Sequence, residues 1–171
     1  RQKERYLRPV AVGDALGCML LTEPQAGSDA GNLRTRAVRT ANSYLINGSK
    51  ALITSAQAAR FACVIAVTDP DAGKKGISAF LVPTDRPGYQ VLRHERKLGH
   101  RSNQTCQVEL ENLEVPEEDM LGAPGEGLKI ALSGLDAGRI AVAAQSIGVA
   151  RAAFEAALGY ANERETFGRK I

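Results

Sequence analysis

The sequence predicts an α+β protein, in which an antiparallel β-sandwich or barrel is followed by one long α-helix. Two observations lead to this prediction. From Cys18 to Val115 short apolar runs alternate with turn signals, as in an all-β domain. From Gly125 onward the apolar residues recur with the period of a helix, and proline is absent. The charged first residues, Arg1 to Arg8, are expected to be the tail of an earlier helix.

Three stretches of the first region have the pattern of strands. Phe61–Thr68 and Ile77–Val82 are short apolar runs that contain β-branched residues. Within Cys106–Leu110 apolar and polar residues alternate, the period of a half-buried strand. Pro- and Gly-containing turn signals separate such runs, at Asp69–Gly73 and Arg86–Gly88.

The pair Asn47-Gly48 is a strong signal for a tight turn. It predicts a hairpin that places Tyr44–Ile46 and Leu52–Thr54 on neighbouring strands.

The second region has the pattern of a long amphipathic helix. Gly134 and Gly138 lie four residues apart inside it, and each glycine costs a helix about 1 kcal/mol relative to alanine. We therefore expect a ligand or another helix to lie against that part. The apolar residues that share one face are Ile140, Ala143, Ile147, Ala150, Phe154 and Leu158. Such a face predicts a partner, either a helical bundle or another subunit.

Composition excludes several classes of protein. The chain has 171 residues and a net charge of +3, from 22 basic and 19 acidic residues, which does not favour nucleic acid as a partner. Its three cysteines are widely spaced and predict neither a disulfide framework nor a metal site. No run of about 18 apolar residues is present, so we expect no membrane span.

Two loops combine residue types that suit ligand binding. In Leu20–Asp29 an apolar run enters a small, polar loop whose Gly27 permits close approach of a ligand to the backbone. In Glu163–Gly168 an Arg, a hydroxyl and an aromatic follow the helix and could hold a phosphate and stack on a base. From the residues alone, an ordinary loop and a helix C-cap at Gly168 explain these stretches as well.

Taken in order, these stretches resemble the acyl-CoA dehydrogenase family over nearly the whole chain. Any one motif is weak evidence, but the ordered set is specific. The matching stretches are Glu4–Leu7, Leu20–Asp29, Asn47–Ser55, Lys74–Val82, Lys97–Ser102, Val115–Pro116, Asp136–Arg139 and Arg164–Gly168.

The resemblance implies a division into domains. The family has an N-terminal helical domain, a middle β domain and a C-terminal four-helix domain. Residues 1–15 would end the first, residues 16–122 would form the second, and residues 123–171 would begin the third with its first long helix. More than half of a usual family chain would lie outside this sequence. The family's homotetramer would supply the partners that the helix needs.

The resemblance also implies a reaction, an FAD-dependent oxidation of fatty acid metabolism. The family removes two hydrogens from a saturated acyl-CoA to give the trans-2-enoyl-CoA. A glutamate takes the α-proton, and the β-hydride passes to the flavin. The implied partners are acyl-CoA, with a short or medium chain preferred, and electron-transferring flavoprotein. A bacterial cytoplasm is the expected compartment, or the mitochondrial matrix in a eukaryote.

Site residues follow by matching position with the family. For the substrate, Ser28 would touch the thioester arm, while Asp136 and Arg139 would contact the CoA portion. The residues implied to bind FAD are Met19, Leu21, Thr22, Gly27, Ser28, Leu52, Ile53, Thr54, Arg164, Thr166 and Phe167, the last three reaching the FAD of a neighbouring subunit.

The sequence departs from the family pattern at informative positions. Met19 and Leu52 stand where the family often has aromatic residues, so less stacking on the flavin is expected. In one branch the catalytic glutamate precedes the matching Arg on the long helix, and that position here is Gly138. The resemblance therefore implies no catalytic base in this chain and places it beyond Ile171. Glu23 matches a structural turn residue of the family.

Two alternatives remain open at this stage. The first is a flavoprotein with another reaction on the same fold, such as an acyl-CoA oxidase or a nitroalkane oxidase. The second is a non-catalytic, DNA-associated relative, which predicts a strongly basic face.

Overall fold

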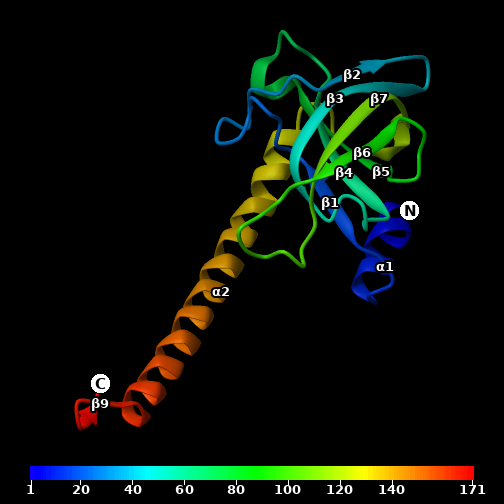
Figure 1. Ribbon diagram of the computed structural model, residues 1–171. Coiled ribbons are helices and arrows are strands. Elements are labelled where there is room, and N and C mark those ends of the chain that lie inside the picture. The colour runs from blue at the N-terminus through cyan, green and yellow to red at the C-terminus, as the bar shows by residue number, and fades with distance from the viewer. The chain divides into compact units, whose positions relative to one another are not determined.

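The computed structural model describes residues 1–171 and divides into two compact units, Arg1–Ala131 and Leu132–Ile171. The first unit holds a large sheet and a short N-terminal helical segment, and the second holds most of one long helix and a small hairpin (Figure 1). The fold class is thus α+β, as predicted.

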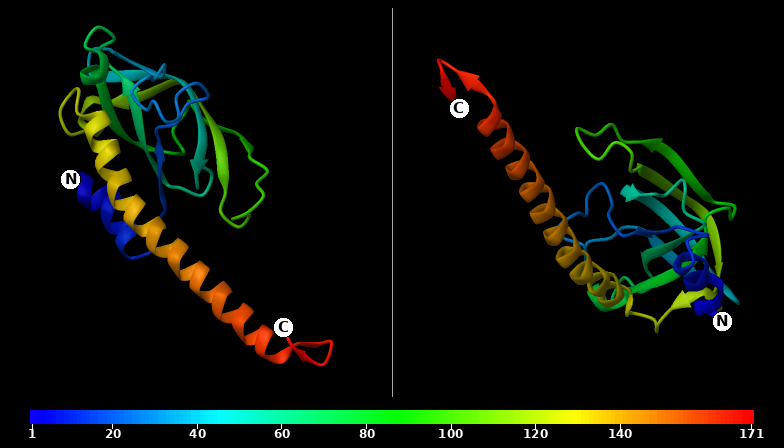
Figure 2. Two further views of the ribbon diagram at one scale, coloured as in Figure 1. Left: turned by 90° about the vertical axis from the view of Figure 1, so that its left-hand side faces the viewer. Right: turned by 90° about the horizontal axis from the view of Figure 1, so that it is seen from below.

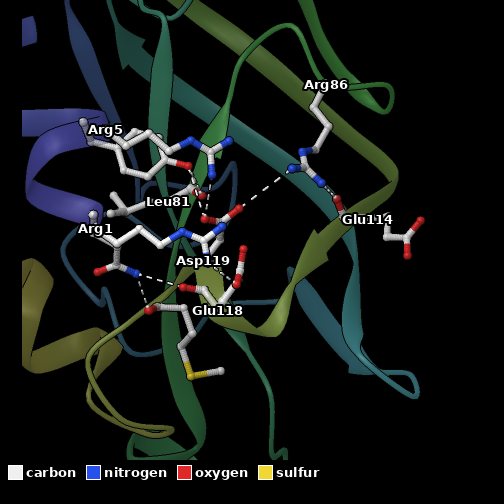
Figure 3. Close-up of polar contacts among 10 residues, drawn as sticks. Arg1, Arg5, Leu81, Arg86, Glu114, Glu118 and Asp119 are labelled. Atoms are coloured by element: carbon white, nitrogen blue, oxygen red, sulfur yellow. Dashed lines mark hydrogen bonds and ion pairs between the residues drawn. The ribbon is translucent and has the colours of Figure 1, made fainter.

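The N-terminal segment is helical, in agreement with the sequence. A π-helical turn, Lys3–Leu7, runs directly into α1, Arg8–Ala11. Buried Asp119 ties this segment to the sheet, because its Oδ1 accepts hydrogen bonds from Arg5 (3.1 Å) and from the Tyr6 hydroxyl (3.4 Å). Arg86 approaches the other carboxylate oxygen at 3.8 Å (Figure 3).

One eight-stranded sheet forms the body of the first unit, with the strand order β6-β7-β3-β2-β4-β5-β8 and β1 beside β4. Most neighbours are antiparallel, whereas β4 pairs in parallel with β1 and with β2. The strands are β1 (Gly17–Leu20), β2 (Arg36–Arg39), β3 (Ser43–Thr54), β4 (Phe61–Val67), β5 (Ile77–Pro83), β6 (Tyr89–His94), β7 (Thr105–Pro116) and β8 (Met120–Leu121). Short 3-10 turns at Gly73–Gly76 and Glu117–Asp119 precede β5 and β8.

The predicted hairpin at Asn47-Gly48 is wrong, because both residues lie inside the single strand β3. The pairing of β3 with β7 shifts register around this point, so the Asn-Gly pair forms an irregularity in the strand. Gly48 has a φ of +150°, and a Cβ there would lie 2.7 Å from the Thr35 Cα. The Asn47 side chain accepts a hydrogen bond from the Asn112 N–H instead of closing a turn.

The sheet buries apolar side chains on both faces of its central strands. One face carries the main core, to which β1, β3, β4, β5 and β7 contribute. On the other face, the Tyr6 ring packs on Phe61 with centroids 5.1 Å apart. The start of the long helix covers β5 so closely that a Cβ on Gly127 would meet the backbone of Ser78.

The long helix α2 spans Gly127–Glu163, and a hairpin of β9 (Glu165–Thr166) and β10 (Arg169–Lys170) follows it. Gly127 and Ala131 are buried within the first unit. Beyond them, exposed apolar side chains are not confined to one side of the helix, since Ile140 and Val142 lie on opposite sides. The exposed large apolar residues of α2 are Leu132, Ile140, Val142, Ile147, Val149, Phe154, Leu158 and Tyr160.

By length and composition, α2 is long and apolar enough to cross a membrane, which neither confirms nor overturns the expectation of no membrane span. Its many alanines, together with Ile, Leu and Val, raise the hydropathy without forming one unbroken apolar run. The helices of soluble bundles meet the same criterion when they are buried by partners, so length and composition are weak evidence for a span.

Candidate functional site

Two segments that the sequence singled out meet beside the sheet. The loop that follows β1 contains Leu21, Thr22 and Ser28, and the end of β3 contains Leu52–Thr54. The N–H of Ala51 donates a hydrogen bond of 2.9 Å to the Thr22 carbonyl, which joins the two segments side by side. Residues about 30 positions apart in the chain therefore form one continuous surface.

Several polar groups on this surface have no partner within the chain. The Thr22 N–H and the hydroxyls of Thr22, Ser28 and Thr54 make no hydrogen bond with another group of the protein. No atom lies within 4 Å of a Cβ placed on Gly27, so the loop is open at that point. Such a set of unpaired donors and acceptors beside open backbone is suited to a polar ligand.

The backbone at the end of β3 is strained. Leu52 and Ser55 have φ values of 58° and 60°, in the left-handed region that non-glycine residues rarely adopt. Each costs of order 1–3 kcal/mol, and strain of this kind concentrates at functional sites. As a result, Leu52 presents its side chain outward with 61% exposure. Ile53 points into the core, so it can offer a ligand only its backbone.

Met19 occupies a different position from Leu21 and Thr22. It is half-buried within β1, where it pairs with Cys63 of β4. Leu21 is buried, and Thr22 is half-buried.

A buried ion pair of Glu23 and Lys50 supports both segments, and Lys50 was not among the site residues expected from the sequence. The Lys50 ammonium lies 2.8 Å from Glu23 Oε1, and both side chains are almost fully inaccessible. Lys50 also donates hydrogen bonds to the carbonyls of Leu21 (3.1 Å) and Ile65 (2.8 Å). A lysine directly before the apolar residues Ala51, Leu52 and Ile53 was the available signal, because a buried ammonium requires a carboxylate partner.

Glu23 closes the loop that begins at Leu21. Its carboxylate accepts backbone hydrogen bonds from Arg34 (2.6 Å) and Thr35 (3.1 Å), and one from the Gln25 side chain (2.7 Å). Glu23 and Ala26 also exchange two backbone hydrogen bonds of 3.0 Å. This turn geometry agrees with the structural role expected for Glu23.

The environment of the pair changes both pKa values. Burial acts to raise the pKa of Glu23, but the Lys50 charge and the hydrogen bonds from Lys50, Thr35 and Arg34 outweigh it and lower this pKa to about 2. Burial lowers the pKa of Lys50 to about 8, although Glu23 opposes that change. At neutral pH both groups are therefore charged.

A cationic hollow of about 440 Å³ borders the end of β3. It lies within the β6–β7 loop, which projects from the edge of the sheet in both views of Figure 2. His94, Arg96, Lys97 and Arg101 contribute to its lining. The loop is fixed to the β3 segment by a 2.9 Å hydrogen bond from the Ser55 N–H to the Gln104 carbonyl.

The remaining candidate residues lie in the second unit. Asp136 and Arg139 are both exposed on α2. Gly134 and Gly138 have no neighbour within 4 Å of a Cβ position, and they line a shallow apolar hollow with Val142.

A tight turn displays Phe167 at the C-terminal hairpin. Phe167 and Gly168 have φ values of 51° and 75°, the pattern of a two-residue hairpin turn between β9 and β10. The Phe167 side chain is 99% exposed. Arg164 is exposed, and Thr166 is half-buried. Gly168 therefore forms part of the hairpin turn. The sequence alone had also allowed a helix C-cap at this residue.

Two family models match this chain. Residues 18–113 match "Acyl-CoA dehydrogenase, middle domain", and residues 125–171 match "Acyl-CoA dehydrogenase, C-terminal domain". The chain belongs to the acyl-CoA dehydrogenase family, as its motifs indicated.

Curated relatives carry the same family name. An acyl-CoA dehydrogenase of Bacillus subtilis is 48% identical over 99% of this chain and 45% of its own length. The mitochondrial short-chain specific acyl-CoA dehydrogenase of Homo sapiens is 44% identical over 99% of this chain and 41% of its own length. This chain thus spans less than half the length of these relatives.

Solved structures agree over the same range. Butyryl-CoA dehydrogenase from Megasphaera elsdenii matches 99% of this chain and 44% of its own, with a TM-score of 0.96 and 42% identity. A chain from a structure of the electron transferring flavoprotein of Acidaminococcus fermentans matches with a TM-score of 0.96 and 46% identity, covering 99% of this chain and 45% of that one. An FAD-dependent dehydrogenase matches with a TM-score of 0.95 and 31% identity, over 99% and 45% of the two chains.

Proposed function

We propose that this chain is part of an FAD-dependent acyl-CoA dehydrogenase that converts a short acyl-CoA to its trans-2-enoyl-CoA. Family membership supports the reaction class. The short-chain specific and butyryl-CoA dehydrogenases among its relatives support a short acyl chain. The observation that carries the proposal is the surface formed by Thr22 and Leu52, with its unpaired polar groups and strained backbone.

The residues of this surface fit a flavin ring. An exposed Leu52 beside free Thr22 and Thr54 groups offers an apolar contact next to hydrogen-bonding atoms, as a flat heteroaromatic ring with a polar edge requires. Met19 would complete the apolar contact, and the buried Leu21 and Ile53 would contribute through their backbones. Bound FAD would supply the hydride acceptor of the reaction.

The small residues of the loop would make room for the substrate. Gly27 leaves open space in which a thioester arm can pass, and the free Ser28 hydroxyl lies beside it. Asp136 and Arg139, exposed on α2, would contact the CoA portion. Gly138 carries no acid–base group, so we propose that the catalytic glutamate lies outside residues 1–171.

Arg164, Thr166 and Phe167 would hold the FAD of a neighbouring subunit in a homotetramer. The strained and fully exposed Phe167 supports this role, because an aromatic held outward at a hairpin tip is suited to stacking on a base. The exposed apolar residues of α2 would then pack against the other helices of a four-helix domain rather than cross a membrane.

We propose that residues 1–15 end an N-terminal helical domain, that residues 16–122 form the middle β domain, and that residues 123–171 begin the C-terminal helical domain. Acyl-CoA is the proposed substrate, and electron-transferring flavoprotein is the proposed electron acceptor, with no role for nucleic acid. Relatives from a bacterium and from mitochondria support a bacterial cytoplasm or the mitochondrial matrix as the compartment.

An anaerobic titration of the full-length, FAD-loaded protein with butyryl-CoA tests this proposal. We expect the absorption band of the oxidised flavin to bleach and an enoyl-CoA to form. A flavin that stays oxidised with every acyl-CoA from four to sixteen carbons would refute the dehydrogenase proposal. Rapid reoxidation of the reduced flavin by oxygen, with formation of hydrogen peroxide, would indicate an acyl-CoA oxidase instead.

A further inference from the structure

We propose that Lys50 and Glu23 are positioning residues for FAD, which set the geometry of both flavin-contacting segments and strengthen the Thr22 N–H as a hydrogen-bond donor. This inference rests on the proposed function. It assigns a role in cofactor binding and flavin potential to a buried pair that touches neither the cofactor nor the substrate.

Lys50 lies between the two flavin-contacting segments. Lys50 precedes Leu52 by two residues in β3, and its side chain reaches across to the Leu21 carbonyl in the other segment. The three hydrogen bonds to Leu21, Glu23 and Ile65 use all three N–H groups of the ammonium. A side chain with every donor engaged has little freedom, so it holds the two segments at a fixed separation.

Glu23 anchors the loop that contains Gly27 and Ser28. This loop has no regular structure, and hydrogen bonds to Glu23 hold both of its ends. At the start of the loop, the Glu23 carboxylate accepts a hydrogen bond from Lys50 of β3. It also accepts hydrogen bonds from the backbone N–H groups of Arg34 and Thr35, at the end of the loop. Loss of the charge on Glu23 would therefore loosen the loop. It would also leave Lys50 without its carboxylate partner.

The charge of Lys50 also acts on the Thr22 N–H. The Leu21 carbonyl and the Thr22 N–H belong to the same peptide group, and the Lys50 ammonium lies 3.1 Å from that carbonyl oxygen. A cation on the oxygen polarises the peptide and makes its N–H a stronger donor. The Thr22 N–H has no acceptor in the chain, so it is free to donate to a ligand. A stronger donor favours a reduced, more electron-rich flavin over the oxidised form.

The buried location makes these effects large. Both side chains are almost completely inaccessible, so water does not screen the charge on Lys50. Removing a single partner leaves an unpaired buried charge, which destabilises the fold strongly. A double substitution to neutral residues removes the pair without that penalty.

The experiment compares FAD affinity and flavin reduction potential in the full-length protein and its variants. The test variant is the double substitution Glu23→Gln and Lys50→Met, with each single substitution beside it. The matched control is Asp119→Asn, which weakens the ion pairs of the other buried carboxylate of the first unit. Apoprotein melting temperature, FAD dissociation constant and midpoint potential are measured for each.

We expect the double variant to bind FAD at least tenfold more weakly and to shift the flavin potential to a more negative value. Asp119→Asn lowers the melting temperature and leaves the FAD affinity and the potential unchanged. If wild type binds FAD and the double variant matches it in affinity and potential, the pair is purely structural and this inference fails. If wild-type protein does not bind FAD, the proposed function itself fails.

Discussion

Only three charged side chains, Glu23, Lys50 and Asp119, are buried in this protein. The interior of a protein tolerates a charge only when a partner and hydrogen bonds compensate for lost water. Lys50 and Glu23 meet that condition completely, since each ammonium N–H and each carboxylate oxygen has a partner. Asp119 meets it less well, because its Oδ2 has no hydrogen bond.

The lowered pKa of Glu23 predicts how stability depends on pH. The folded-state pKa is about 2, below the ordinary value of 4.5, so its contribution is complete above about pH 4.5 and is lost as the pH falls toward 2. The shift corresponds to roughly 3 kcal/mol. As the pH falls across this range, the free energy of unfolding measured in urea should therefore decrease by roughly 3 kcal/mol more for wild type than for Glu23→Gln. Parallel stability curves for the two proteins would contradict this role of Glu23.

The strained backbone of Leu52 predicts an unusual response to glycine. Leu52→Gly should raise the stability of the apoprotein by about 1 kcal/mol, because glycine adopts a φ of 58° without strain. The same substitution should weaken FAD binding, since the contact with the ring is lost. Thermal unfolding and FAD titration measure the two effects.

Leu92→Gly is the matched control for Leu52→Gly. Leu92 is also an exposed leucine, with 52% exposure, but it lies in β6 and has no positive φ. Glycine there should lower stability by roughly 0.5–1 kcal/mol. If Leu52→Gly lowers the stability of the apoprotein as much as Leu92→Gly does, the backbone of Leu52 is not strained.

Single elements show where reasoning from sequence succeeded and where it did not. The runs at Phe61–Thr68 and Ile77–Val82 were recognisable as strands because their composition and turn boundaries are local properties. The outcome at Asn47-Gly48 depends on a distant residue. Thr35, which directly precedes β2, packs against Gly48. This tertiary contact favours a strand irregularity over the turn that the Asn-Gly pair favours locally.

The irregularity in β3 predicts a sensitive position at Gly48. Gly48→Ala should lower stability by about 2 kcal/mol or more, because the new Cβ would overlap Thr35 at an unfavourable φ. Gly99→Ala is the control, since no atom lies within 4 Å of its Cβ position. Urea unfolding of both variants measures the difference, and equal stabilities would contradict the close approach of Thr35.

At the scale of the molecule, the two units differ in how completely they bury their apolar residues. The first unit has a continuous core, whereas the apolar side chains of α2 beyond Ala131 are exposed on more than one side. We expect a chain that ends at Ala131 to keep the cooperative thermal unfolding of residues 1–171, since residues 132–171 add little to the core. A protein of residues 1–131 without a cooperative transition would contradict this.

The segments of the candidate site were recognisable in the sequence, because each motif is contiguous in the chain. Thr22 and Leu52 were expected at the flavin by matching position with the family, and the structure brings their segments side by side. Ile53 was expected there too, but its side chain lies in the core, beyond a shift in the register of β3 against β7 between Lys50 and Ile53. Lys50 had no assigned role, because a partnership with Glu23 across 27 residues is a property of the folded chain.

The most direct test of the account is hydrogen–deuterium exchange of the full-length protein with and without FAD. We predict that FAD slows exchange in the segments around Leu21–Ser28 and Leu52–Thr54, including the free Thr22 N–H. Unchanged exchange in both segments, in a protein that demonstrably binds FAD, would contradict the assignment of the flavin to this surface.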